Sequence, residues 1–317
     1  MQRRGLLAWP ALLPGLAHAQ SAGLQLIVPY PPGGGNDIGA RALAPLLERE
    51  LGMPVVVLNR AGAASQIGMT QIARALPDGR TIGYGLWPQT TTLYLDPARQ
   101  AQFSRASFTP LALHVTDPGV IVVRADSPWR SLADLVAASR ARPDDVRMSD
   151  NGRFGHEHMA SIALQRMAGL RFNQVHYQGA GPAIAALLGG QTEVAIFAIG
   201  TVRAQTEQGA MRALAILSES ESPHLPAIPT AAAQGFAITA GSARGFVAPA
   251  GLPPAIFQSL TAALERAIAA PEHAERMRQL AIPITYRNAE GFARYWEAEE
   301  QALTPLMAEL LRPGAAD

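Results

Sequence analysis

The feature of the sequence that most constrains its fold is the regular alternation of short apolar segments with helical patterns. An apolar run of strand length at 24–29 is followed by a helical pattern over 36–52 and a second apolar run at 54–58. A further helical segment at 67–76 and a strand-like run at 81–86 continue the alternation. This βαβ order is typical of largely parallel sheets with helices on both faces, so the sequence predicts an α/β protein.

The alternation resumes after residue 120, and a chain of 317 residues exceeds what one hydrophobic core usually supports. We therefore expect two lobes: residues 20–116 with 244–317, and residues 117–243, with a hinge near 112–120 and 238–246. The expected elements of the second half are strands at 120–123, 146–149, 175–177, 194–198, 214–217 and 245–248, and helices at 131–140, 155–168, 182–188, 253–269 and 289–311.

The first residues have the three-part pattern of a secretory signal peptide. Arg3 and Arg4 precede the mostly apolar stretch 5–16, and Ala17-His18-Ala19 has the small-x-small form of a cleavage site. The apolar stretch is too short to span a bilayer. We therefore predict that residues 1–19 are removed and that the protein is secreted to the periplasm.

Two residue types are missing from the sequence, and this narrows its chemistry. The chain has no cysteine, which excludes disulfides and cysteine-bound metals. It also has no lysine, which excludes a P-loop lysine and Schiff-base catalysis. With a net charge of +1 and no basic run, nucleic acid is not an expected partner.

The loop from Tyr30 to Asp37 joins the first expected strand to the first expected helix and contains three successive glycines, Gly33 to Gly35. Glycine lets a backbone approach a ligand closely, and a helix N-terminus offers free N–H groups and positive dipole charge. We expect an anion site here, with Asn36 or Asp37 as the helix N-cap. The loop is not a dinucleotide fingerprint, because its third glycine position is Ile38.

A second loop, Ser149 to His156, also joins a strand to a helix, in the other lobe. If both loops face one cleft, two helix N-termini converge on the same anion. Arg153 is either a bidentate carboxylate ligand or a solvent-exposed loop residue, and Phe154 either stacks on a ligand ring or packs under the loop.

Catalytic and metal-binding patterns are weak. The sequence has no G-x-S-x-G elbow, and His156 and His158 are two residues apart, so on a helix they point to different faces. The acids Glu297, Glu299 and Glu300 belong to an amphipathic helix that we interpret as a packing element. We expect no cofactor, no metal and no enzymatic activity.

Taken in order, several short motifs resemble the receptor proteins of tripartite tricarboxylate transporters, known as Bug proteins. Each motif alone is weak, but together they run along almost the whole chain after residue 19. The matching segments are VPYPPGGGND at 28–37, LGMPVVV at 51–57, NRAGA at 59–63, PDG at 77–79, FTPL at 108–111, YQGAGP at 177–182, LGGQ at 188–191, LPAIPT at 225–230 and APAG at 248–251.

The resemblance implies a two-lobed periplasmic binding protein fold of type II, the Venus flytrap, with two crossover segments as hinge. It implies a monomeric receptor that captures a small organic carboxylate and delivers it to membrane transporter subunits. Two alternatives stay open at this point: a sensor subunit for a membrane signalling protein, and a hydrolase that uses the same cleft. Receptor and sensor share every sequence feature.

The chain departs from the family pattern at two places that bear on the ligand. The second loop usually reads S-x-G-x-G-S, but its last two positions here are Phe154 and Gly155, and Arg244 lies near the return crossover, where a Trp is common. We hypothesise a ligand unlike citrate or a small dicarboxylate, such as an aromatic or bulkier monocarboxylate. The residues expected to bind it are Tyr30, Gly34, Gly35, Asn36, Asp37, Gln89, Thr90, Ser149, Asn151, Gly152, Arg153, Phe154, Gly155, Tyr177, Gly179 and Arg244.

Overall fold

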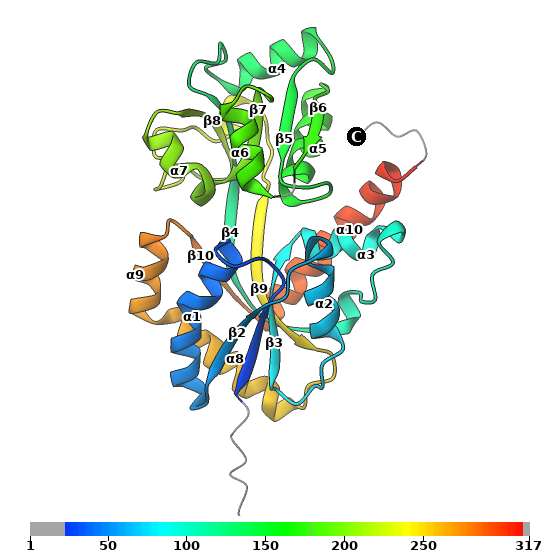
Figure 1. Ribbon diagram of the computed structural model, residues 1–317, viewed down its shortest axis with the longest axis vertical. Helices are drawn as coiled ribbons and strands as arrows, with labels where there is room; N and C mark the ends of the chain where they lie inside the picture. The colour runs from blue at the N-terminus through cyan, green and yellow to red at the C-terminus, as the bar shows by residue number, and fades with distance from the viewer. Residues whose placement is uncertain (1–22, 178, 313–317) are drawn as a thin grey trace, which may run out of the picture.

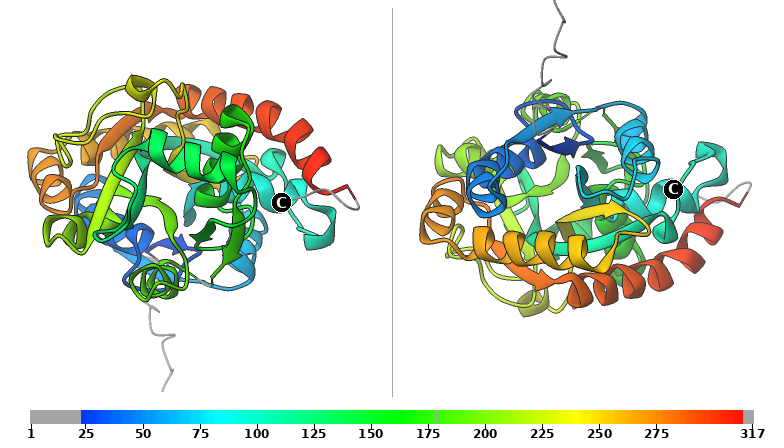
Figure 2. Two further views of the ribbon diagram at one scale, coloured as in Figure 1. Left: turned by 90° about the horizontal axis from the view of Figure 1, so that it is seen from above. Right: turned by 90° about the horizontal axis from the view of Figure 1, so that it is seen from below.

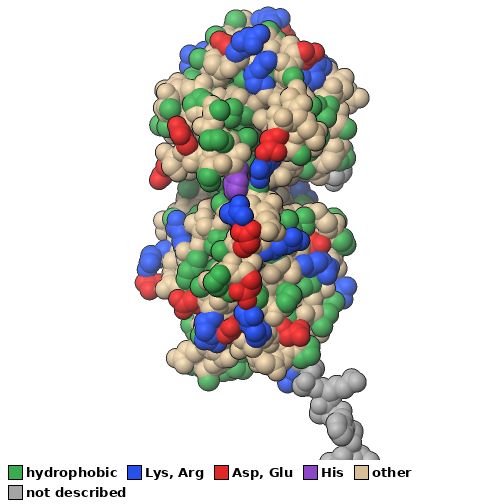
Figure 3. All heavy atoms as spheres, turned by 90° about the vertical axis from the view of Figure 1, so that its left-hand side faces the viewer, with side chains coloured by type: hydrophobic (Ala, Val, Ile, Leu, Met, Phe, Trp, Pro, Cys, Tyr) green, Lys and Arg blue, Asp and Glu red, His purple; other side chains and the backbone are tan. Residues whose placement is uncertain are grey.

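The protein consists of two lobes stacked along its longest axis, and two long strands run through both (Figure 1). The computed structural model describes residues 23–177 and 179–312, so the expected signal peptide at 1–19 lies outside the described residues. The shared strands are β4 (Phe108–Arg124) and β9 (Gly241–Pro249), which pair antiparallel. In the space-filling view the surface narrows to a waist between the lobes (Figure 3).

The lower lobe is built on a mixed sheet. Strand β1 (Leu24–Val28) pairs in parallel with β2 (Val55–Asn59) on one side and β3 (Thr81–Trp87) on the other. Strand β9 lies antiparallel beside β3, and β10 (Ile284–Asn288) pairs antiparallel with β4. Strand β1 is buried except at its second residue, as expected for a strand covered on both faces.

Helices cover both faces of the lower sheet. Helices α1 (Gly35–Leu51) and α8 (Pro254–Ala269) share one apolar core with β1. Helices α2 (Gln66–Ala73), α3 (Gln89–Leu95) and α10 (Ala289–Leu310) share a second core, in which Trp87 and Trp296 meet edge to face with 4.8 Å between ring centres. Helix α9 (Pro271–Gln279) packs its Met277 against β4.

The upper lobe repeats the plan. Strand β5 (Arg147–Asp150) pairs in parallel with β6 (Asn173–His176) and β7 (Val194–Ala198). The second half of β4 pairs antiparallel with β7 and with β8 (Met211–Leu217). Helices α4 (Leu132–Ala141) and α5 (His156–Ala168) contribute to one apolar cluster, and α6 (Ala180–Leu188) and α7 (Ile199–Glu207) to another.

The predicted two-lobed α/β class is confirmed, and the local differences have physical causes. The predicted N-cap at Asn36 or Asp37 is wrong: α1 begins at Gly35 after Gly34, which makes no side-chain cap. The run at 120–123 is only the end of the 17-residue strand β4. Helices α3, α7 and α9 and strand β10 were not predicted, because α3, α7 and β10 are short and α9 is mostly polar. The residue boundaries predicted for the lobes stay a prediction.

Helix α10 reaches from the lower lobe to the upper one and lies along the outside of the molecule (Figure 2). Its Leu303 and Met307 belong to an apolar cluster with Phe154, which precedes α5, and Met159, which lies in the first turn of α5. Arg166 on α5 also pairs with Glu309, at 2.9 Å. None of the helices within residues 23–177 and 179–312 combines the length and the apolar character that crossing a membrane requires.

Candidate functional site

The first glycine loop is held in shape by Asp37. One carboxylate oxygen accepts the backbone N–H of Gly33 at 2.9 Å, and the other accepts Arg41 Nε and Asn59 Nδ2, both at 2.9 Å. Burial raises the pKa of Asp37, but these hydrogen bonds outweigh it and hold the pKa below its ordinary value. The Asp37 carboxylate is therefore occupied by the loop itself.

Replacing Asp37 by alanine should lower the free energy of unfolding by about 2–4 kcal/mol, because three charge-assisted hydrogen bonds are lost together. Urea denaturation at neutral pH would measure the change. Asp78→Ala is a suitable control, since that exposed carboxylate accepts the N–H of Arg80, two residues away. Equal midpoints for wild type and Asp37→Ala would contradict this role.

Arg244 on β9 lies beside the start of α1. Its Nη2 is 3.0 Å from the point that a Cβ on Gly35 would occupy, and 3.4 Å from Asp117 Oδ2 on β4. The residue is only 7% exposed. Over the described part of the chain, its Nε and Nη1 find no hydrogen-bond partner. A buried guanidinium therefore stands next to the positive end of a helix, where an anion would be favoured.

Tyr30 and Asn36 border the same region. The Tyr30 hydroxyl is buried, and burial raises its pKa against the opposing effects of the Ser65 side chain and of the charge on Arg244, so the phenol stays protonated. Asn36 Nδ2 points to the carbonyls of Tyr84 and Gly85, at 3.4 Å each. The first loop thus offers Gly34 and Gly35 backbone, a phenol and the neighbouring guanidinium.

The second loop is organised by Asp150 at the end of β5. Its Oδ1 accepts the N–H of Gly152 at 2.8 Å, and its Oδ2 lies 2.8 Å from His176 Nδ1. Gly152 has φ +146°, a conformation that favours glycine. The carbonyl of Asn151 accepts the N–H of Gly179 at 3.2 Å. Asp150 therefore fixes the loop, in which the N–H groups of Gly152, Phe154 and Gly155 are all hydrogen-bonded within the protein.

Asp150, His176 and His158 also bring their ligand atoms within 4.8 Å of one another, which is close enough to hold a metal ion. However, His158 Nδ1 accepts the backbone N–H of Phe154 at 2.9 Å. A neutral ring that accepts at Nδ1 carries its proton on Nε2, so it has no lone pair there for a metal. We interpret the three residues as a hydrogen-bonded support for the loop.

The second loop meets the lower lobe at helix α3. Gln89 Oε1 lies 3.3 Å from the point that a Cβ on Gly155 would occupy, and Thr92 Oγ1 donates to the Phe154 carbonyl at 3.0 Å. The Phe154 ring is buried between α5 and α10, and the exposed Arg153 guanidinium lies 4.3 Å above it. The ring therefore packs under its loop.

Three predicted binding residues have their polar atoms engaged in the protein. Thr90 Oγ1 donates to the Leu86 carbonyl at 2.8 Å, and Ser149 Oγ accepts from Thr192 Oγ1 at 3.2 Å. The N–H of Tyr177 donates to the Asp150 carbonyl at 3.1 Å. These contacts position the ends of α3, β5 and β6 around the waist.

The structure also places polar residues at the junction that sequence reasoning did not select. Asp117 on β4 pairs across the strands with Ser242 on β9, and both are 2% exposed. His156 and Glu157 open α5 and are buried as well. Two features of the sequence could have identified these residues. Asp117 is the single acid in the largely apolar strand β4, and Glu157 lies in the first turn of a helix.

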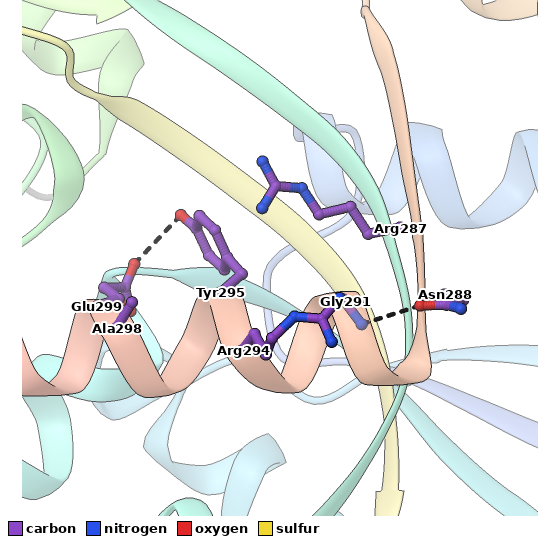
Figure 4. A pocket seen from close by; sticks show the side chains of 7 residues that line it. All are labelled: Arg287, Asn288, Gly291, Arg294, Tyr295, Ala298 and Glu299. Carbon is purple, nitrogen blue, oxygen red and sulfur yellow. Dashed lines mark hydrogen bonds between the residues drawn. The ribbon is translucent and has the colours of Figure 1, made fainter.

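A separate hollow of about 580 Å³ is lined by residues of β10 and α10, and Arg244 is not among them (Figure 4). Arg287, Arg294, Tyr295 and Glu299 line it, and Arg294 pairs with Glu290 on the same helix. Its arginines are already partnered or exposed, so we place the candidate site at the lobe junction.

Comparison with known proteins agrees with this architecture. Residues 39–310 match the model of the tripartite tricarboxylate transporter family receptors. The protein BugT of Bordetella pertussis is 35% identical over 77% of this chain and 76% of its own. MatC of Rhodopseudomonas palustris, solved with bound malate, is 25% identical with a TM-score of 0.79, covering 90% of this chain and 98% of that one. A second protein of that organism, solved with adipate, is 25% identical with a TM-score of 0.78, covering 90% and 96%.

Proposed function

The chain belongs to the tripartite tricarboxylate transporter family of receptors, and from this premise we propose that it captures a small organic carboxylate between its lobes for a membrane transporter. The matched family is one of receptors, not of enzymes. The relatives solved with malate and adipate support a carboxylate as the ligand class. Delivery to transporter subunits and a periplasmic location are parts of this proposal.

The observation that carries the proposal is the buried guanidinium of Arg244 against the N-terminus of α1. An arginine with unpartnered nitrogens at such a place is strongly disfavoured unless an anion compensates it. Two charge-assisted hydrogen bonds of about 1.5–3 kcal/mol each, together with about 0.5–1 kcal/mol from the helix dipole, suffice for micromolar affinity when backbone N–H groups add to them.

The lobes would close over the ligand by bending the two shared strands. We propose the hinge at 112–120 and 238–246, where β4 passes Pro118 and β9 begins. The contacts of α3 and α10 with the second loop already join one lobe to the other in this structure, so they would break if the lobes opened. Ligand binding would thus change the position of one lobe relative to the other.

A thermal-shift screen of short aliphatic and aromatic carboxylates tests the proposal. We expect at least one carboxylate, at about 100 times its Kd, to stabilise the protein by about 2.7 kcal/mol, which corresponds to roughly 5 °C in Tm. The primary amide of the same compound should give no shift, because it lacks the charge that Arg244 requires. Mass spectrometry after incubation should recover the ligand unchanged. A panel without any carboxylate-specific shift, or recovery of a reaction product, would contradict the proposed function.

A further inference from the structure

Two carboxylates lie at the lobe junction beside the cation of the proposed carboxylate site. Asp117 on β4 and Glu157 on α5 are each 2% exposed. Among the described residues, Asp117 Oδ1 and Glu157 Oε2 form no hydrogen bond of good geometry, although the backbone N–H of Ile199 at the start of α7 lies beside Asp117 and helps to oppose the rise in its pKa. Buried carboxylate oxygens without donors are strongly unfavourable, so these two atoms point to a donor that the protein does not itself supply.

The two acids belong to one connected group of side chains. Asp117 Oδ2 lies 3.4 Å from Arg244 Nη2, and burial raises the pKa of Asp117 while Arg244 and the neighbouring His156 oppose that shift. His156 Nε2 in turn lies 2.8 Å from Glu157 Oε1. The series therefore runs from Arg244 in the shared strand β9 to the first turn of α5 in the upper lobe, across the junction.

Asp117 is more than a counter-ion for Arg244. A compact carboxylate–guanidinium pair makes two hydrogen bonds of about 2.7–2.9 Å. Here one long contact of 3.4 Å joins the two groups, while two nitrogens and one oxygen stay unpartnered. A cation and an anion that can each form further hydrogen bonds thus lie side by side. A ligand that carries both charges would complement them.

A plain dicarboxylate fits this arrangement poorly. Its first carboxylate would be held by Arg244 and the start of α1, but it would lie close to Asp117. Two like charges about 4–6 Å apart repel strongly where little water screens them. A cationic or N–H-bearing group next to the ligand carboxylate removes that repulsion and supplies the missing donors.

Building on the proposed function, we propose that the ligand is an amino-substituted carboxylate whose carboxylate binds Arg244 and whose ammonium group binds Asp117, with Glu157 as a second acceptor. The site then selects for the α-amino group in addition to the carboxylate. The carbon skeleton of the ligand is set by other parts of the junction.

The test compares ligands that differ only by an α-amino group. Suitable pairs are succinate and aspartate, glutarate and glutamate, isovalerate and valine, and 3-phenylpropionate and phenylalanine. Isothermal titration with the full chain should give a Kd at least 10-fold lower for the amino member of whichever pair binds. The N-acetyl derivative, which lacks the positive charge, should lose this advantage.

Two substitutions locate the effect. Asp117→Asn should reduce the preference for the amino member at least 10-fold and leave the plain carboxylate equally or more tightly bound. Glu157→Gln should reduce the same preference by a smaller factor. It provides an independent measurement of this preference if the Asp117 variant does not fold. Asp126→Asn is the control, because that acid is exposed in the upper lobe and pairs with Arg124.

The outcomes separate this proposal from the one on which it rests. Binding of the plain carboxylates as tightly as their amino analogues, with the ratio unchanged by Asp117→Asn, would overturn the amino-carboxylate proposal and leave the receptor function in place. Binding of neither member of any pair would contradict the receptor function and this proposal together.

Discussion

Replacement of Arg244 by methionine should weaken carboxylate binding by a factor of about 100 or more. The guanidinium contributes two free N–H-bearing nitrogens next to the N-terminus of α1, and charge-assisted hydrogen bonds are worth about 1.5–3 kcal/mol each. Methionine keeps the apolar stem of the side chain, so most of its packing is preserved while the charge and its donors are lost. Isothermal titration with the ligand found in the screen measures the change.

The single variant leaves Asp117 buried beside an apolar side chain, so a second variant is needed. Burial already raises the pKa of Asp117 against the opposing charge of Arg244, and loss of that charge would raise it further. In the double variant Arg244→Met with Asp117→Asn, neither buried charge remains. We expect it to be as stable as wild type or more so, because buried ion pairs are often replaced without loss of stability.

The exposed Arg278, which pairs with Glu275 on α9, gives the matched control Arg278→Met. It should bind ligand like wild type, because a surface ion pair contributes little. A double variant that folds well and still binds the carboxylate with unchanged affinity would remove Arg244 from the site and with it the main support for our proposal.

Much of the fold follows from the sequence because its strands and helices have strong local signals. The run Leu24–Val28 lies between two other parallel strands, so nearly all its residues are buried and apolar. This apolar run, followed by a glycine-rich turn, allowed the strand to be predicted. Strand β4 was harder, because it is a single strand shared by two lobes and contains His114 and Asp117. Their burial depends on partners from distant segments, such as Tyr84, whose hydroxyl lies 2.7 Å from His114 Nδ1.

The candidate site was predictable in its backbone and less so in its charges. Successive glycines before a helix indicate an anion site by local chemistry alone, and Gly34 and Gly35 do lie at the start of α1. That they bind an anion stays a prediction. Whether a side chain faces the ligand or supports the loop depends on tertiary contacts. Asp37 binds its own loop, and Phe154 packs on α10, and neither contact has a local sequence signature. The Asp117–Arg244 pair joins residues 127 positions apart.

A partly buried acid on α10 makes the stability of the protein dependent on pH. Glu299 is packed behind α3, where Thr91 Oγ1 donates to its Oε2 at 2.7 Å and the Tyr295 hydroxyl lies 3.4 Å from its Oε1. Burial raises the pKa of Glu299 to about 8, and the hydrogen bonds from Thr91 and Tyr295 oppose that shift only in part. The folded protein therefore holds a proton on this carboxyl at neutral pH.

Glu299→Gln should stabilise the protein at alkaline pH. The unfolded chain releases the proton near pH 4.5 and the folded chain near pH 8, so wild type loses about 1.4 kcal/mol of stability per pH unit across this window. Stability from Glu299 is thus fully present below about pH 4.5 and lost as the pH rises through 8. Glutamine keeps the shape and stays neutral, so its advantage over wild type should grow with pH to on the order of 4 kcal/mol by pH 9.

Urea denaturation of wild type and Glu299→Gln at pH 5, 7 and 9 would measure this difference. Burial lowers the pKa of His114 well below its usual value, so both proteins also lose stability below about pH 6.5, and that loss cancels in the comparison. Glu290→Gln, an exposed substitution on the same helix, should show no such trend. A difference between wild type and Glu299→Gln that stays constant from pH 5 to 9 would mean that Glu299 is ionised in the folded protein, and that water or a nearby cation compensates its burial.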